Sequence, residues 1–127
     1  MFDRLSVYSP YALAALRIIA ALLFMAHGTQ KLFGFPVAEG ATGGGASGIF
    51  LIAGILEVFG GLLIAVGFLT RPVAFILSGM MAVAYFMAHA PQNFYPVFNG
   101  GDAAILFCFI FLYLFFAGPG ALSVDKR

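Results

Sequence analysis

The sequence predicts an all-α membrane protein, a bundle of four transmembrane helices that forms a single domain over residues 1–127. Composition is the first reason: 63% of the residues are hydrophobic, 9% are charged, and the mean hydropathy is +1.07. Soluble domains contain about 45–50% apolar and about 25% charged residues. A soluble chain of this length has too much surface to hide so many apolar side chains, so lipid is the expected solvent.

Four apolar stretches are the second reason. A hydrocarbon core of about 30 Å is crossed by about 20 apolar residues in a helix. The predicted spans lie at about residues 10–33, 47–69, 72–90 and 102–117. The fourth is the shortest, so we expect it to thin the bilayer locally or to be shielded by a partner.

The breaks between these stretches support the same division. A glycine-rich segment at 40–48 precedes the second span, and Pro72 suits the first position of the third helix. Asp102 is expected to cap the fourth helix, and the Gly-Pro-Gly run at 118–120 is expected to end it.

The positions of the basic residues are the third observation, and they predict the orientation. If four spans alternate, four basic residues fall on one side of the membrane: Arg4, Arg71, Lys126 and Arg127. The opposite loops, at about 34–46 and 91–101, contain no lysine or arginine. Because basic residues concentrate on the cytoplasmic side, we expect both termini and the 70–72 turn in the cytoplasm.

Polar residues inside the spans are the candidates for function, since a charged group in lipid costs several kcal/mol unless it faces protein or water. Helical spacing directs them toward a common interior. We take seven as candidates for a quinone site, another ligand site or a polar core: Arg17, His27, Lys31, Glu57, Tyr85, His89 and Asp102. No residue is assigned a catalytic role, and no metal site is predicted.

Depth along the helices separates these candidates. We place Glu57 near the midplane, on a face where Gly54 and Gly61 allow close helix packing. Arg17 lies in the cytoplasmic half, offset from Glu57 by about 8 Å. Their side chains also lean apart, so a pair of Glu57 with His27 or Lys31 is at least as compatible with the sequence. Four candidates are expected in the external half: His27, Lys31, His89 and Asp102.

Each candidate also has a structural interpretation. Arg17 can extend to the cytoplasmic headgroups, and Lys31 can anchor a span end at the interface. Glu57 can form an interhelical hydrogen bond, and Asp102 can act only as a helix cap. Tyr85 and His89 can be ordinary residues of the membrane interface.

Composition also limits partners and cofactors. The net charge of +1 provides no basic surface for a nucleic acid. Cys108 is the single cysteine, which excludes an internal disulfide, a CxxC pair and a cysteine-rich zinc site. His27 and His89 could be axial ligands of a b-type haem, but His89 lies at the very end of its span, so we do not favour haem.

Several motifs in order along the chain resemble the DoxX family. They are Arg17, His-Gly-Thr-Gln-Lys-Leu at 27–32, Gly-x-x-Glu-x-x-Gly-Gly at 54–61, Gly-Phe-Leu-Thr-Arg-Pro at 67–72 and Gly-Pro-Gly-Ala-Leu-Ser-Val-Asp at 118–125. The resemblance implies a small, multi-pass, four-helix protein of the bacterial cytoplasmic (inner) membrane. The family takes its name from a subunit associated with a thiosulfate:quinone oxidoreductase, and some members are linked to oxidative-stress complexes.

The resemblance therefore implies a redox-associated, quinone-linked accessory subunit with a polar intramembrane site. A self-contained oxidoreductase is not supported, because the sequence has no dinucleotide-binding glycine motif, haem-attachment motif or paired cysteines. The alternative is a non-enzymatic subunit that assembles or stabilises a larger membrane complex. A small proton-coupled transporter is the third and least favoured interpretation. The expected partners are the lipid bilayer and either another membrane protein or further copies of this chain.

Overall fold

A computed structural model describes residues 2–35 and 48–125. Every regular element in these residues is a helix, which confirms the all-α prediction. In chain order the elements are a 3₁₀ helix η1 (Asp3–Tyr8), α1 (Ser9–Phe33), α2 (Ile49–Val66), α3 (Thr70–Ala84), a π-helix η2 (Tyr85–His89), a 3₁₀ helix η3 (Ala90–Gln92), α4 (Pro96–Asn99) and α5 (Asp102–Ala117).

Three continuous helical segments of the described chain are long and apolar enough to cross a membrane. They run over Asp3–Phe33, Ile49–Val66 and Thr70–Gln92. α5 is a shorter apolar helix: at about 1.5 Å per residue, its 16 residues rise about 24 Å. That rise is less than a hydrocarbon core of about 30 Å, as expected for the shortest apolar stretch.

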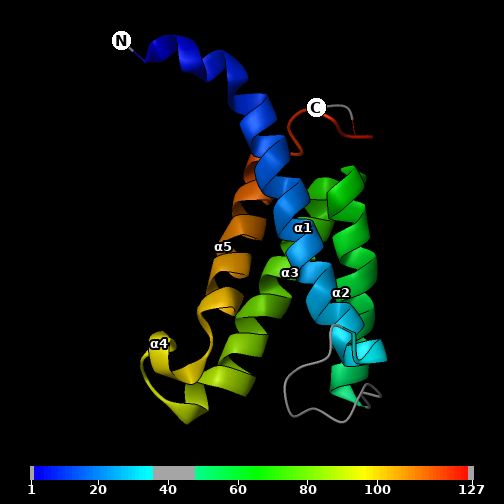
Figure 1. Cartoon of the computed structure of the whole chain (residues 1–127), viewed down its shortest axis with the longest axis vertical. Helices are drawn as coiled ribbons and strands as arrows, with labels where there is room; N and C mark the ends of the chain where they lie inside the picture. Colours follow the sequence, from blue (N-terminus) through cyan, green and yellow to red (C-terminus); the bar gives the residue numbers. More distant parts are fainter. Residues whose placement is uncertain (1, 36–47, 126–127) are drawn as a thin grey trace.

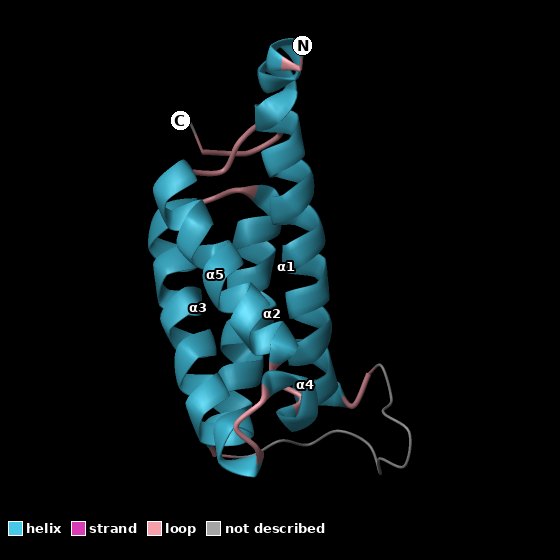
Figure 2. Cartoon of the chain, turned by 90° about the vertical axis from the view of Figure 1, so that its left-hand side faces the viewer, coloured by secondary structure: helices cyan, strands magenta, loops and turns pink. Residues whose placement is uncertain are grey.

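The helices lie roughly parallel in a bundle (Figures 1 and 2). α1 packs closely on α2 and α3 packs closely on α5, whereas the backbones of α1 and α5 come close at few positions. Both termini lie at one end of the bundle, called the terminal end below. α4 lies at the opposite end, called the loop end (Figure 1).

Aromatic and aliphatic side chains fill the centre of the bundle. Phe24 of α1 meets the edges of Phe107 and Phe111 of α5, with ring centroids 5.3 and 4.9 Å apart. Many large apolar side chains are exposed on the outer faces, including Ile19, Leu22 and Phe109. This distribution suits helices whose outer faces contact lipid instead of water.

Small residues bring α1 and α2 together, as the glycine spacing predicted. A Cβ atom added at Gly54 would lie 2.9 Å from Leu32 Cδ2, and one added at Gly28 would lie 2.8 Å from Glu57 Cβ. At Gly28 the added atom would also lie 2.9 Å from the Gly54 carbonyl oxygen, so this position has no room for a side chain, whereas at Gly54 the Leu32 side chain would have to shift. The close approach of the two backbones fixes Glu57 directly against α1.

The turn between α2 and α3 differs from the expectation in one detail. Gly67 and Leu69 adopt left-handed backbone conformations, with φ of +73° and +54°, which reverses the chain within three residues. α3 then begins at Thr70, so Pro72 is its third residue and not its first. Contacts from the end of the chain, described below, explain this earlier start.

Candidate functional site

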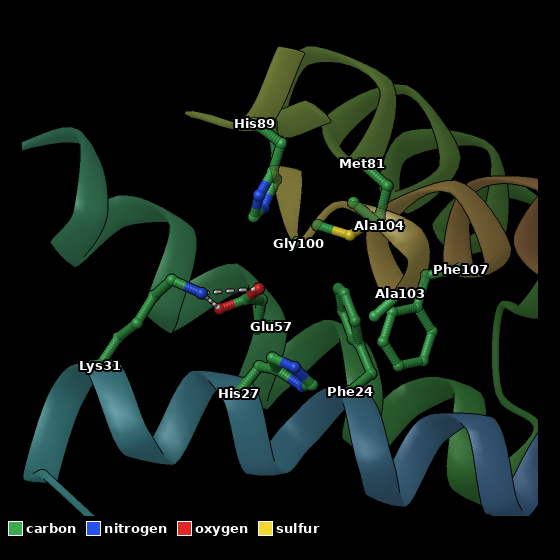
Figure 3. Close-up of a pocket in the computed structure, with 11 residues that line it drawn as sticks. Phe24, His27, Lys31, Glu57, Met81, His89, Gly100, Ala103, Ala104 and Phe107 are labelled. Atoms are coloured by element: carbon green, nitrogen blue, oxygen red, sulfur yellow. Dashed lines mark hydrogen bonds and ion pairs between the residues drawn. The ribbon is translucent and has the colours of Figure 1, made fainter. Parts of the chain in front are cut away.

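A cavity of about 150 Å³ lies in the bundle near the loop end (Figure 3). One side of it carries the polar groups His27, Lys31, Glu57 and His89. The other side is formed by apolar residues and glycine: Phe24, Met81, Ala84, Gly100, Ala103, Ala104 and Phe107. The cavity therefore brings together four of the seven candidates, from three separate helical segments.

Lys31 and Glu57 form an ion pair between α1 and α2. Lys31 Nζ lies 2.8 Å from Glu57 Oε1 and 3.1 Å from Oε2, so the ammonium group contacts both carboxylate oxygens. The Glu57 side chain is 4% exposed and that of Lys31 is 29% exposed. Of the pairings that the sequence left open for Glu57, the structure has the one with Lys31.

The two histidines are both held through Nδ1. His27 Nδ1 donates to the carbonyl of Leu23 at 2.9 Å, and His89 Nδ1 donates to the carbonyl of Asn99 at 3.1 Å. A carbonyl oxygen can only accept, so Nδ1 carries the hydrogen in each ring. In the neutral form, each histidine therefore keeps Nε2 as an acceptor for a bound group.

His89 reaches the cavity because the last turn of its helix is widened. η2 places it after α3 in π-helical geometry, which often occurs at functional sites. The side chain of Asn99, a residue that is 3% exposed, links η2 to the start of α5. Its Nδ2 donates to Tyr85 Oη at 3.0 Å, and its Oδ1 accepts from the N–H of Gly101 at 2.8 Å.

The sequence analysis missed Asn99 because it is uncharged and lies between predicted spans. The signal that could have revealed it is the run Asn-Gly-Gly at 99–101, since asparagine followed by glycine favours a turn in which the amide side chain bonds to nearby backbone. Gly100, with φ of +75°, provides the left-handed residue of that turn.

Tyr85 and Asp102 do not line the cavity. The Tyr85 ring stacks on His89 at a centroid distance of 6.3 Å, so it supports the histidine from outside the cavity. The prediction that Asp102 caps α5 was wrong. Gly101 is the N-cap and makes no side-chain cap bond; Asp102 is exposed in the first helical turn.

Arg17 lies apart from the cavity, toward the terminal end, and is completely buried. Its guanidinium group donates to the carbonyls of Pro119, Ala121 (2.9 Å) and Leu122 (2.7 Å), and more weakly to that of Ala65 (3.4 Å). Arg17 neither extends to the headgroups nor pairs with Glu57. Instead it binds the segment 118–125, which we call the strap.

The strap closes the terminal end by bonding to three helices or their ends. Ala121 N–H donates to Pro10 O of α1 at 3.0 Å, and Val124 N–H donates to Val66 O of α2 at 3.0 Å. Asp125 accepts from the N–H groups of Leu69 (2.9 Å) and Thr70 (2.8 Å), and so caps α3. This cap, supplied from 55 residues away, explains why α3 begins at Thr70.

The environment of Asp125 favours its charged form. Partial burial alone raises the pKa of this carboxyl, but the backbone hydrogen bonds from Thr70 and Leu69 and the nearby charge of Arg17 outweigh it. The pKa of Asp125 therefore lies below its ordinary value of 3.8. The strap motif and Arg17 form a structural unit, separate from the cavity.

The described residues contain no group of three or more His, Cys, Asp or Glu side chains arranged to hold a metal ion. Cys108 is a free thiol whose Sγ lies 3.5 Å from Ser78 Oγ between α3 and α5. Cys108 is not among the residues that line the cavity.

Comparisons with known proteins agree with the resemblance seen in the sequence. The DoxX family model matches residues 12–90, which contain the four polar residues of the cavity. The chain is 42% identical to an uncharacterized protein of Haemophilus influenzae, over 98% of this chain and 96% of that one. It is 30% identical to the inner membrane protein YphA of Escherichia coli (93% and 91% covered) and 31% identical to the inner membrane protein YqjF of the same organism (87% and 86% covered). No solved structure matches it.

Proposed function

The chain belongs to the DoxX family of bacterial inner-membrane proteins, and we propose that it is a redox-associated accessory subunit that binds a quinone ring in the loop-end cavity. One observation carries the proposal: a ring-sized cavity has hydrogen-bonding groups on one side and aromatic and thioether side chains on the other. That division suits a flat ring with polar groups at its edge.

The size of the cavity supports a single ring. A cavity of about 150 Å³ in a protein interior can hold a benzene-sized molecule. Drug-sized ligands occupy pockets of about 300–1,000 Å³, so the cavity is too small for a macrocycle such as haem. Phe24 and Phe107 offer aromatic surface to the ring, and Met81 offers a polarisable thioether.

The polar groups match both redox forms of a quinone. A quinone presents carbonyl acceptors, and its reduced form presents hydroxyl donors; bound here, it would supply two-electron, two-proton chemistry. Lys31 can donate to a carbonyl, and Nε2 of His27 or His89 can accept from a hydroxyl. Glu57 orients the ammonium group of Lys31 through the ion pair.

An accessory role follows from what the chain can do by itself. Its polar groups can bind, orient and exchange protons with a ring, while the sequence offers no paired cysteines or dinucleotide motif to carry electrons onward. We therefore assign the electron transfer to a partner oxidoreductase. The charge distribution further supports both termini in the cytoplasm, which would put the cavity in the external half of the membrane.

Titration of the purified protein with a chainless benzoquinone, followed by calorimetry in detergent, tests this proposal. We expect saturable binding that Glu57→Gln weakens about tenfold, since Lys31 loses its oriented charge, which corresponds to about 1.4 kcal/mol. Asp102→Asn is the matched control: it removes a carboxylate at the same end of the bundle but outside the cavity, and should bind like the wild type. Absence of saturable binding to the wild-type protein would remove the proposal.

The length of α5 favours a second candidate, a non-enzymatic assembly subunit. A helix that rises about 24 Å leaves part of the hydrocarbon core unmatched, and a neighbouring membrane protein can cover the difference. Native mass spectrometry in mild detergent distinguishes the two: a stable hetero-complex without extractable quinone would favour assembly over quinone binding.

A further inference from the structure

We infer that the apolar groove between α1 and α5 holds the hydrocarbon chain of the ligand, and that the ligand enters the cavity sideways from the lipid between these helices. The inference rests on the proposed function and deepens it, because it names the ligand as a chain-bearing quinone and not a small soluble one. Four observations support it.

The first observation is the groove itself. It has a volume of about 500 Å³ and lies beside the ring-sized cavity. Its lining is entirely hydrocarbon: Ala15, Leu16, Ile19, Ala20 and Leu23 from α1, and Ala103, Leu106, Phe107 and Ile110 from α5. Along α1 it extends from Ala15 to Leu23, a rise of about 12 Å. An extended hydrocarbon chain fits such a surface.

The second observation is continuity. Ala103 and Phe107 line both the groove and the cavity. The Phe107 centroid lies 5.7 Å from that of His27 and 5.3 Å from that of Phe24, two residues that line the cavity. His27 and Ala103 are themselves exposed, so the cavity opens on the side where the groove runs. A ring in the cavity could thus continue into a chain in the groove.

The third observation is the wide spacing between the backbones of α1 and α5. The backbones of these helices come close at few positions, unlike those of the pairs α1–α2 and α3–α5. The rings of Phe24 and His27 on α1 still meet Phe107 of α5. Small side chains at Ala15, Ala20 and Ala103 leave the space between them. The opening therefore lies on the side of the bundle that faces lipid, where a membrane-soluble ligand would arrive.

The fourth observation is charge, which selects a neutral headgroup. Lys31 is the cation at the cavity, and its ammonium group is neutralised by Glu57 at 2.8 Å (Figure 3). The phosphate of a phospholipid would meet the Glu57 carboxylate as well as the lysine, so the pair gives no net attraction to an anion. An uncharged quinone ring has no such conflict.

A photoreactive ligand tests the inference directly. The probe is a benzoquinone whose hydrocarbon chain ends in a diazirine, added to the full chain in lipid nanodiscs, with labelled residues mapped by mass spectrometry. We expect labels on Leu16, Ile19, Leu106 and Ile110, and loss of the labels with excess unlabelled chain-bearing quinone. Labels spread over outward residues such as Leu22 and Phe109, or displaced equally by a phospholipid, would overturn the inference.

A pair of variants provides the second measurement. Ile19→Trp fills the groove away from the cavity, and Leu22→Trp adds the same bulk to an exposed position of α1 outside the groove. We expect Ile19→Trp to weaken binding of a chain-bearing quinone about tenfold relative to Leu22→Trp, while binding of a chainless benzoquinone stays equal in both. Equal affinity of both variants for the chain-bearing quinone would overturn the chain site alone. Failure of every protein to bind the chainless ring would instead overturn the proposed function.

Discussion

Glu57 is buried in the bundle with its carboxyl oxygens against the ammonium group of Lys31. Burying a carboxylate in low-dielectric surroundings carries a large desolvation cost, which a partner within hydrogen-bond distance offsets. The geometry, with Nζ 2.8 and 3.1 Å from the two oxygens, fulfils that requirement. We therefore expect the losses in free energy of unfolding caused by replacing Lys31 and Glu57 singly not to add up in the double variant.

Lys31→Met should destabilise the protein by about 3–5 kcal/mol, since it leaves a buried carboxylate without a counter-charge. The double variant Lys31→Met/Glu57→Gln removes both charges and should recover most of that loss. Unfolding by SDS titration from mild detergent micelles measures both. Equal stability of the single and double variants would show that Glu57 does not need Lys31.

Arg17 shows how a buried charged residue can have a structural role by donating to backbone carbonyls. Its guanidinium group satisfies three carbonyls of the strap, which otherwise would be left without donors near the end of the bundle. Arg17→Met should therefore release the strap and speed proteolysis at residues 118–125 at least several-fold. Arg4→Met, at an exposed position, is the control and should be cleaved like the wild type. Unchanged protection of the strap in Arg17→Met would contradict this role.

Which polar residues lie inside the bundle was easier to predict from the sequence than which residues they contact. Helical spacing and membrane depth made a pair of Glu57 with His27 or Lys31 at least as compatible with the sequence as one with Arg17, and the structure has the pair with Lys31. The contacts of Arg17 were not predictable in the same way, since they join positions more than 100 residues apart. Asn99 was not predicted as a site residue, because its contacts depend on the geometry of a turn and not on charge.

Helices in this chain are delimited partly by distant segments. The ends of the apolar stretches were predictable from hydrophobicity, yet α3 starts at Thr70 because Asp125 accepts its first free N–H groups. The π-helical turn at Tyr85–His89 likewise has no local sequence signature, and it depends on Asn99 and its surroundings. The prediction that Asp102 caps α5 was wrong because the local backbone decides the cap position. Asp102 has a suitable side chain, but the helix begins so that Gly101 is the N-cap.

The strap should respond to acid through Asp125. The pKa of this carboxyl is below its ordinary value of 3.8 in the folded protein, so its charged form stabilises the attached strap. That stabilisation is fully present above pH 3.8 and is lost as the pH falls through the folded pKa. A fluorophore can be attached to Val124→Cys in a Cys108→Ser background. Its fluorescence anisotropy should fall as the pH drops below 3.8 and through the pKa of Asp125 in the folded protein. Asp125→Asn should show low anisotropy at every pH; a pH response preserved in Asp125→Asn would assign the effect to another group.

The bundle as a whole has two chemically different ends. The terminal end carries Arg71 beside the strap, where a Cβ added at Gly118 would lie 2.8 Å from an Arg71 nitrogen, and Arg4 lies in the exposed η1. The loop end carries the cavity and the aromatic residues Phe94, Tyr95 and Phe98, which are exposed. Exposed aromatic residues are typical of both membrane interfaces, and Phe2, Tyr8 and Tyr11 are exposed toward the terminal end. The basic residues alone therefore favour a cytoplasmic terminal end.

The orientation can be tested with single cysteines in the Cys108→Ser background. Phe94→Cys reports the loop end and Leu5→Cys reports the terminal end; both positions are exposed. In intact cells, we expect a membrane-impermeant maleimide to label Phe94→Cys but not Leu5→Cys, because the positive-inside rule puts the terminal end in the cytoplasm. After the membranes are permeabilised, both cysteines should react, which controls for accessibility. The opposite pattern in intact cells would invert the protein and move the cavity to the cytoplasmic half, so that a quinone bound there would exchange protons with the cytoplasm instead of the external side.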